Sequence, residues 1–160
     1  MTEGAPLGLW REEILPDWVD YNGHLNEAYY LLIFSHATDA FMDHIGMTPG
    51  PEHRKETSLY TLETHLCYLE ECSAGQEVEI ATQLLDLDKK RFHIFHAMTL
   101  AGREELLATA EMVSLHVEMS GPRAAAFSPE TLARLEAIYS RHKALPRPTQ
   151  VNGVMGLKRK

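Results

Sequence analysis

The stretch from residue 27 to residue 44 constrains the fold more than any other part of this 160-residue chain. It contains no proline or glycine, and its larger apolar residues recur at helical spacing: Tyr30, Phe34, Ala37 and Phe41. Residues 28–34 are apolar on every side, and one flat sheet would cover only one side of such a helix. The sequence therefore predicts a buried central helix, ended by Gly46 and by the Pro-Gly-Pro cluster at 49–51.

Four segments with strand character follow the predicted helix, over residues 59–71, 76–88, 90–101 and 105–119. Only a few residues link each segment to the next, and links this short favour antiparallel neighbours in sequence order. A first strand over 7–15 and a closing helix that begins at Ser128-Pro129 complete the pattern. We expect an α+β domain over 1–145, with a curved antiparallel sheet around the central helix, and a loosely held tail over 146–160.

Composition and charge exclude several classes of protein. A net charge of -8 at pH 7 argues against a general nucleic-acid binder, because phosphate contacts need clustered cations. No apolar run approaches the roughly 20 residues of a membrane span, and the N-terminal stretch lacks the pattern of a secretory signal. The two cysteines, Cys67 and Cys72, predict reduced thiols in a cytoplasmic protein. We expect no metal and no cofactor, because the histidines form neither an HxH pair nor an HExxH helix.

A short polar stretch, DYNGHLNE at residues 20–27, lies directly before the predicted helix. Asp20 is the only acid of residues 20–26, so it could activate water or attack a carbonyl, while Asn22 and His24 orient the reacting groups. Gly23 allows a positive φ, and free N–H groups at the helix N-terminus could polarise a substrate carbonyl. The alternative without a catalytic role is that this stretch forms only a turn and that Asn26 only caps the helix.

The motif and the order of elements resemble the hotdog-fold acyl-CoA thioesterases of the 4-hydroxybenzoyl-CoA thioesterase superfamily, over about residues 7–142. Plant acyl-carrier-protein thioesterases carry D-x-N-x-H-x-N before their central helix, and every fixed position is matched here by Asp20, Asn22, His24 and Asn26. In the 4-hydroxybenzoyl-CoA branch, a glycine and a tyrosine follow the aspartate, and Gly23 with Tyr29 or Tyr30 could take those places. The stretches DWVDYNGHLNEAYY, YTLETH, DKKRFHIFH and ATAEMVSLHVE are more closely similar to betainyl-CoA thioesterases of bacterial carnitine breakdown.

The resemblance implies hydrolysis of a short acyl-CoA, with betainyl-CoA as the expected substrate, and a homodimer or dimer of dimers with active sites between subunits. Aromatic faces for a quaternary ammonium, and a counter-charge, could come from Trp18, Tyr29, Tyr30, Phe34, Tyr60 and Glu63. The densest internal basic patch, Lys89-Lys90-Arg91, could contact the phosphates of CoA. One alternative is an enoyl-CoA hydratase, but Gly23 replaces the proline of its D-x-N-P-x-H motif and His24 arrives one residue early. The other alternative is a module that binds acyl-CoA without catalysing a reaction.

Overall fold

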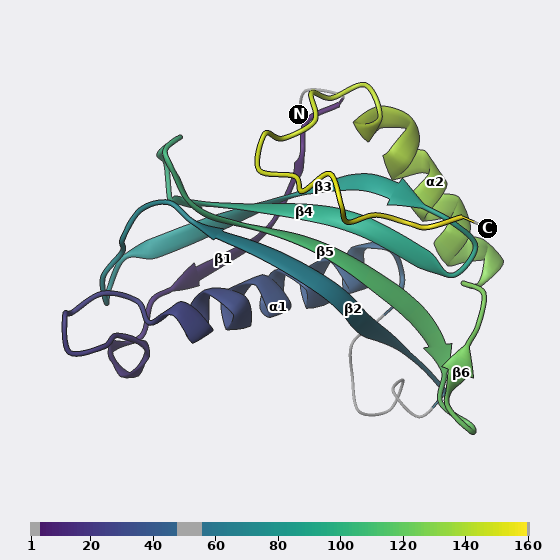
Figure 1. The fold of residues 1–160 in the computed structure, drawn as a ribbon, viewed down its shortest axis with the longest axis horizontal. Helices are drawn as coiled ribbons and strands as arrows, with labels where there is room; N and C mark the ends of the chain where they lie inside the picture. Colours follow the sequence, from purple (N-terminus) through teal and green to yellow (C-terminus); the bar gives the residue numbers. More distant parts are fainter. Residues whose placement is uncertain (1–3, 48–55, 160) are drawn as a thin grey trace.

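The predicted central helix is α1 (Glu27–His44), which lies across one face of a curved sheet (Figure 1). The computed structural model describes residues 4–47 and 56–159, so the predicted stop at 49–51 lies outside the described residues. Asn26 caps the helix, because its side-chain oxygen accepts a hydrogen bond from the Ala28 N–H at 3.0 Å. The chain leaves the other end of the helix through Gly46, whose φ of +84° favours glycine.

Over the described residues, the sheet has six strands: β1 (Leu7–Glu13), β2 (Thr57–Tyr68), β3 (Glu77–Leu87), β4 (Arg91–Leu100), β5 (Leu106–Glu118) and β6 (Arg123–Ala124). All pairings are antiparallel, and the order across the sheet is β1-β3-β4-β5-β2, with β6 paired to the end of β5. The expected antiparallel sheet is confirmed, and β3–β4 and β4–β5 are neighbours as predicted. The short β6 was not predicted.

The prediction that β2 pairs with β3 is wrong. The two edges of β3 are occupied by β1 and β4, so β2 pairs instead with the free edge of β5. The chain between β2 and β3 crosses the end of the sheet and bonds to the segment before α1. There the Leu25 N–H donates to the Cys72 carbonyl at 2.8 Å, and the Ile14 N–H donates to the Gln76 carbonyl at 2.9 Å. The crossing therefore brings a distant part of the sequence next to the polar motif.

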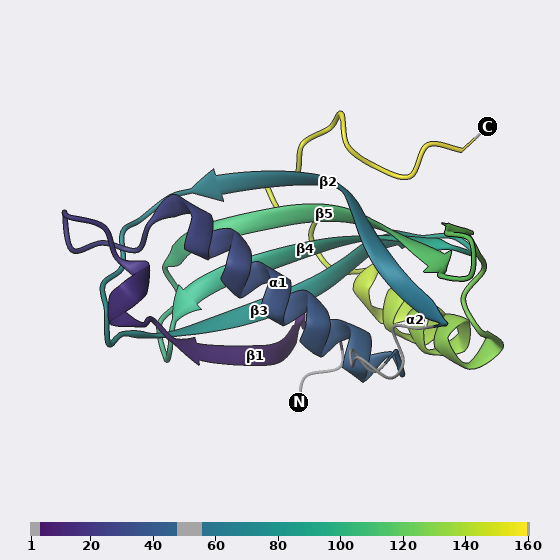
Figure 2. The same ribbon diagram turned by 90° about the horizontal axis from the view of Figure 1, so that it is seen from below.

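The main core lies between α1 and the sheet face that it crosses (Figure 2). Phe41 of the helix and Phe92 of β4 meet edge to face, with ring centroids 5.3 Å apart. The first turns of the helix, which the sequence shows to be apolar on every side, are not fully covered. Leu31 and Leu32 remain 40% and 37% exposed on the side that the sheet leaves open. Among the described residues, no helix is long and apolar enough to cross a membrane.

The closing helix α2 (Pro129–His142) and the C-terminal segment lie on the other side of the sheet from α1 (Figure 1). The predicted Ser128 cap is confirmed, since its hydroxyl accepts from the Thr131 N–H at 3.2 Å. The expectation of a loosely held tail is wrong. Met155 and Leu157 form a buried cluster with a valine of β5, and the Asn152 N–H donates to Glu111 at 2.7 Å. β5 also has an apolar side chain on the sheet face that points away from α1, and the C-terminal segment covers it.

Candidate active site

The polar motif forms a tight turn that holds the Asp20 carboxylate in place. One carboxylate oxygen of Asp20 accepts from the Asn22 N–H at 2.8 Å, and the Gly23 N–H donates to the Asp20 carbonyl at 2.9 Å. Gly23 has φ +79°, which confirms the predicted need for glycine at this position. Because the turn uses only Oδ1 in this bond, it leaves Oδ2 of Asp20 available for another partner.

Hydrogen bonds on both sides fix the turn against the body of the protein. The Asp20 N–H donates to the His24 carbonyl at 3.0 Å, and the Asn26 N–H donates to the Trp18 carbonyl at 2.9 Å. Leu25 points inward and is buried, so it anchors the motif in the core. The polar residues on either side of Leu25 therefore stay at the surface while the turn itself is held firmly.

His24 has a partner that sequence reasoning missed. Its Nε2 lies 3.2 Å from Oε2 of Glu71, in the chain segment that crosses the end of the sheet between β2 and β3. The two side chains are 41% and 74% exposed, so this pair contributes little to stability. Its consequence is geometric, because the carboxylate limits the orientations of the imidazole. No local pattern could have indicated Glu71, since the crossing alone brings it to the motif.

An open hollow of about 610 Å3 lies beside the N-terminus of α1. The structure brings together in it four of the predicted site residues, namely Asp20, Asn22, His24 and Asn26, with Tyr30 of the predicted pocket. The remaining lining residues are Leu25, Glu27, Tyr68, Leu69, Glu70 and Glu71. Most of these come from the end of β2 and from the crossing segment, which no sequence pattern places here.

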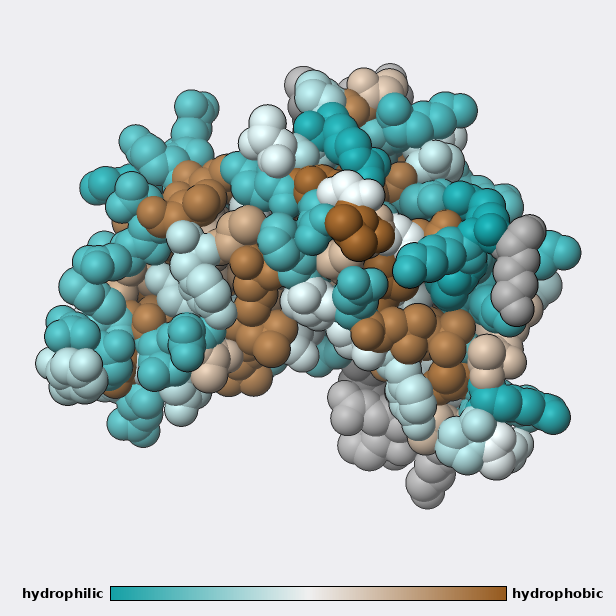
Figure 3. All heavy atoms as spheres, in the orientation of Figure 1, coloured by the Kyte–Doolittle hydropathy of each residue, from teal (hydrophilic) through white to brown (hydrophobic). Residues whose placement is uncertain are grey.

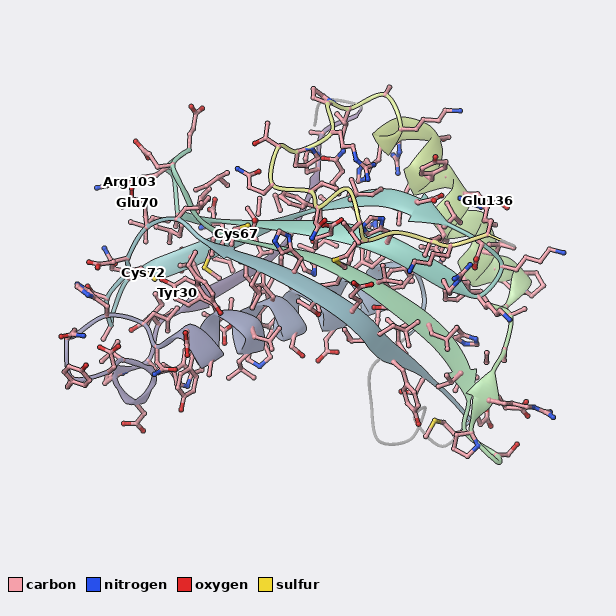
Figure 4. The ribbon with its side chains drawn as sticks, in the orientation of Figure 1. Tyr30, Cys67, Glu70, Cys72, Arg103 and Glu136 are labelled. Atoms are coloured by element: carbon pink, nitrogen blue, oxygen red, sulfur yellow. The ribbon has the colours of Figure 1, made fainter. Side chains whose placement is uncertain are left out.

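Two tyrosine rings form one wall of this hollow. Tyr30 and Tyr68 meet edge to face, with centroids 5.2 Å apart and an angle of 86° between the rings. The Tyr30 hydroxyl donates to the Glu70 carbonyl at 3.2 Å, and the buried thiol of Cys72 donates to the same hydroxyl at 3.5 Å (Figure 4). Burial raises the pKa of Tyr30 and of Cys72, so both groups stay neutral near pH 7.

The N-terminus of α1 offers fewer free N–H groups than expected. The Asn26 cap occupies the Ala28 N–H, and the Tyr29 N–H donates to the Asn26 carbonyl at 3.0 Å. Within the described residues, the Glu27 N–H is the amide of these first three helical positions that has no recorded hydrogen bond. It is therefore the amide best placed to receive an acceptor from a ligand. Tyr29 lies outside the hollow and stacks on Trp18, with centroids 5.6 Å apart.

The other predicted pocket and phosphate residues lie towards the opposite end of the sheet. Tyr60 and Arg91 both pair with Leu115 of β5, whereas Tyr68 at the motif end pairs with Ala108. Glu63 lies between these ends on β2 and does not line the hollow. The Arg91 guanidinium is occupied by Asp88, at 2.8 and 2.6 Å. Lys89 and Lys90 are exposed at the same corner, so one subunit by itself does not bring these residues to the motif.

The histidines of the strands do not form a metal site. Within residues 4–47 and 56–159, no group of three or more His, Cys, Asp and Glu side chains is arranged to hold a metal ion. His93 instead lies 2.7 Å from Glu111, in a buried pair on the sheet face that the C-terminal segment covers. His96 is enclosed on the opposite face, against α1. These two histidines are therefore separated by the sheet itself.

Comparison with known proteins identifies the chain's relatives. The family model of the thioesterase-like superfamily matches residues 14–135. The chain is 50% identical to the betainyl-CoA thioesterase of Pseudomonas aeruginosa, over 94% of this chain and 95% of that protein. It is 35% identical to the L-carnitine dehydrogenase/betainyl-CoA thioesterase of Rhizobium meliloti, over 99% of this chain and only 32% of that longer protein.

Solved structures share the fold over nearly the whole chain. A candidate thioesterase from Pseudomonas putida is 39% identical, with a TM-score of 0.80, over 96% of this chain and 98% of that one. A Staphylococcus aureus protein solved in complex with CoA has a TM-score of 0.82 at 24% identity, over 96% of this chain and 98% of its own. At 24% identity, the similarity to the Staphylococcus aureus protein concerns the fold alone. From its sequence, its curved sheet around α1 and these relatives, the chain belongs to the thioesterase-like superfamily and has the hotdog fold.

Proposed function

We propose that this protein hydrolyses the thioester of a short acyl-CoA, and that its substrate is betainyl-CoA. The observation that carries the proposal is the Asp20 carboxylate, which the turn holds in a hollow beside the N-terminus of α1. Family membership supports the reaction class, and the Pseudomonas aeruginosa relative named as a betainyl-CoA thioesterase supports the acyl group. The free thiols of Cys67 and Cys72 fit a reducing cytoplasmic setting for such a reaction.

Asp20 has two possible roles in this chemistry. As a general base it accepts a proton from water while the water oxygen bonds to the carbonyl carbon; the C–S bond then breaks, and the CoA thiolate takes up a proton. As a nucleophile its Oδ2 bonds to the carbonyl carbon and expels the thiolate, and water then hydrolyses the resulting anhydride. Both routes release the free acid and CoA. Both also need one free carboxylate oxygen, which the bond from Asn22 leaves available.

The charge that develops on the carbonyl oxygen needs a donor. We assign this part to the Glu27 N–H, at the positive end of the helix dipole, with His24, which also lines the hollow, as a second donor. Glu71 then acts through His24, by keeping the imidazole turned towards the hollow. Asn22 and Gly23 shape the turn that positions Asp20, and Asn26 fixes the start of the helix.

Assembly of two subunits through the free edge of β2 is part of this proposal. That edge carries the exposed side chains of Tyr60 and Leu62, and Figure 3 shows apolar surface over this region. If two copies of β2 paired antiparallel about a two-fold axis, the Tyr60 end of one would lie next to the Tyr68 end of the other. Tyr60, Glu63 and the corner formed by Lys89, Lys90 and Arg91 would then serve the partner's site.

An assay of CoA release tests the proposed function. Purified protein is offered betainyl-CoA and a panel of acetyl-, butyryl-, long-chain and aromatic acyl-CoAs, and free thiol is followed with a chromogenic disulfide. Hydration of crotonyl-CoA is measured in parallel. We expect thioester hydrolysis with the highest kcat/KM for betainyl-CoA. Hydration without hydrolysis would identify a hydratase, and binding without turnover would identify a non-catalytic module. Preference for long-chain or aromatic acyl groups would refute the betainyl assignment.

A further inference from the structure

The hollow is rich in acidic side chains. Four carboxylates line it, from Asp20, Glu27, Glu70 and Glu71. Among the residues that the structure describes, the lining contains no lysine or arginine, and His24 is its only residue that can carry a positive charge. Catalysis as proposed uses one of these carboxylates directly and a second, Glu71, through His24. The carboxylates of Glu27 and Glu70 therefore have no part in the reaction as derived above, although both residues line the hollow.

The chemistry of a betainyl thioester requires that its cation and its carbonyl share one hollow. The quaternary nitrogen is two covalent bonds from the carbonyl carbon, which is a separation of about 2.5 Å. An aromatic ring attracts a quaternary ammonium when the ring centroid lies within about 6 Å. The residues that recognise the cation must therefore lie beside the carbonyl group on which Asp20 acts. Within one subunit, the residues of the hollow satisfy this condition, whereas Tyr60 at the far end of β2 does not.

Tyr68 is the aromatic side chain of the hollow that remains open to a ligand. Its side chain is 49% exposed, while Tyr30 behind it is 5% exposed and supports it through the edge-to-face contact. The Tyr68 hydroxyl donates to the Glu27 carbonyl at 3.2 Å, which ties the ring to the first residue of α1. Burial, and then the nearby carboxylate of Glu27, raise the pKa of Tyr68. Tyr68 and Glu27 thus lie close together at one edge of the hollow, joined by the bond from the Tyr68 hydroxyl to the Glu27 carbonyl.

We propose that Tyr68 and Glu27 form the wall that selects a quaternary ammonium acyl group, with the Tyr68 ring against the methyl groups and the Glu27 carboxylate as counter-charge. This inference rests on the proposed thioesterase function and adds the residues that determine its specificity. It differs from the sequence prediction, which assigned the counter-charge to Glu63. Glu70 also lines the hollow, and its backbone carbonyl accepts a hydrogen bond from the Tyr30 hydroxyl at 3.2 Å (Figure 4).

The test compares betainyl-CoA with 3,3-dimethylbutyryl-CoA, which has the same shape without the charge. Selectivity is the ratio of the two kcat/KM values. Tyr68→Leu should lower selectivity about 2- to 30-fold, whereas Tyr68→Phe, which keeps the ring, should change it little. Glu27→Gln keeps the shape of the side chain and should lower selectivity about 2- to 5-fold. Glu136→Gln, an exposed change on α2 far from the hollow, is the matched control and should leave selectivity unchanged (Figure 4).

The outcomes separate this inference from the proposed function. If the wild-type protein hydrolyses neither substrate, the thioesterase proposal itself fails. If it hydrolyses both with equal kcat/KM, or if its preference for the charged substrate survives both Tyr68→Leu and Glu27→Gln, the selecting wall is refuted while hydrolysis stands. Circular dichroism and the melting temperature check that each variant is folded. Should Tyr68→Leu not fold, Glu27→Gln decides the question, because its amide replaces the carboxylate without loss of volume.

Discussion

Acid should destabilise this protein through His96, which is fully buried between α1 and the sheet. Its Nε2 lies 2.9 Å from the Thr38 hydroxyl, its Nδ1 lies 2.8 Å from the Thr82 hydroxyl, and its ring stacks on Phe34. Burial lowers the pKa of His96 to about 3, from an ordinary value of 6.5. The unfolded chain therefore binds a proton at pH 5 that the folded chain does not, so stability falls as the pH falls below about 6.5.

The two pKa values determine the size of the effect. Each pH unit between them is worth about 1.4 kcal/mol, so lowering the pH from 7 to 5 should cost about 2 kcal/mol at His96 alone. The loss continues until the pH approaches the folded pKa of about 3. For a chain of this size, about 2 kcal/mol corresponds to a fall in melting temperature of roughly 4–8 °C.

Urea unfolding at pH 7 and pH 5 measures this loss, at a fixed protein concentration because assembly would add its own contribution. Other groups titrate in the same range, so the variant His96→Gln supplies the comparison. Gln is neutral at both pH values and can still bond to the hydroxyls of Thr38 and Thr82. We expect His96→Gln to be less stable than wild type at pH 7 but to lose about 2 kcal/mol less on going to pH 5. Equal losses in the two proteins would refute the reasoning.

Three further predictions concern the candidate site and the assembly. Asp20→Asn should keep the melting temperature and lower kcat by at least about a hundredfold, the scale of general-base loss, and a near-normal rate would remove Asp20 from the mechanism. Asn26→Ala should cost about 1 kcal/mol of unfolding free energy through the lost cap, while Asn26→Ser should recover most of it in the same urea titration. Sedimentation velocity at micromolar concentration should show a dimer or a dimer of dimers, and a clean monomer would contradict a site shared between subunits.

The sequence by itself determined the local parts of this protein. α1 begins and ends where its cap, its apolar spacing and its glycine indicate, because these signals act within a few residues of one another. The same holds for the turn at Asp20, where an Asn-Gly pair needs no distant partner to form. The motif's likeness to hotdog thioesterases then indicated the family, which the comparisons confirm.

Only the tertiary structure decided what lies around that turn. The strand spacing could not show that β1 occupies the edge of β3, so it could not show that β2 joins β5 or that the chain crosses beside the motif. That crossing brings Glu71 to His24 and Tyr68 to Glu27, whereas Tyr60 is carried to the other end of the sheet. Strand partners are chosen by competition among edges that are distant in sequence, and side-chain alternation is the same whichever edge is chosen.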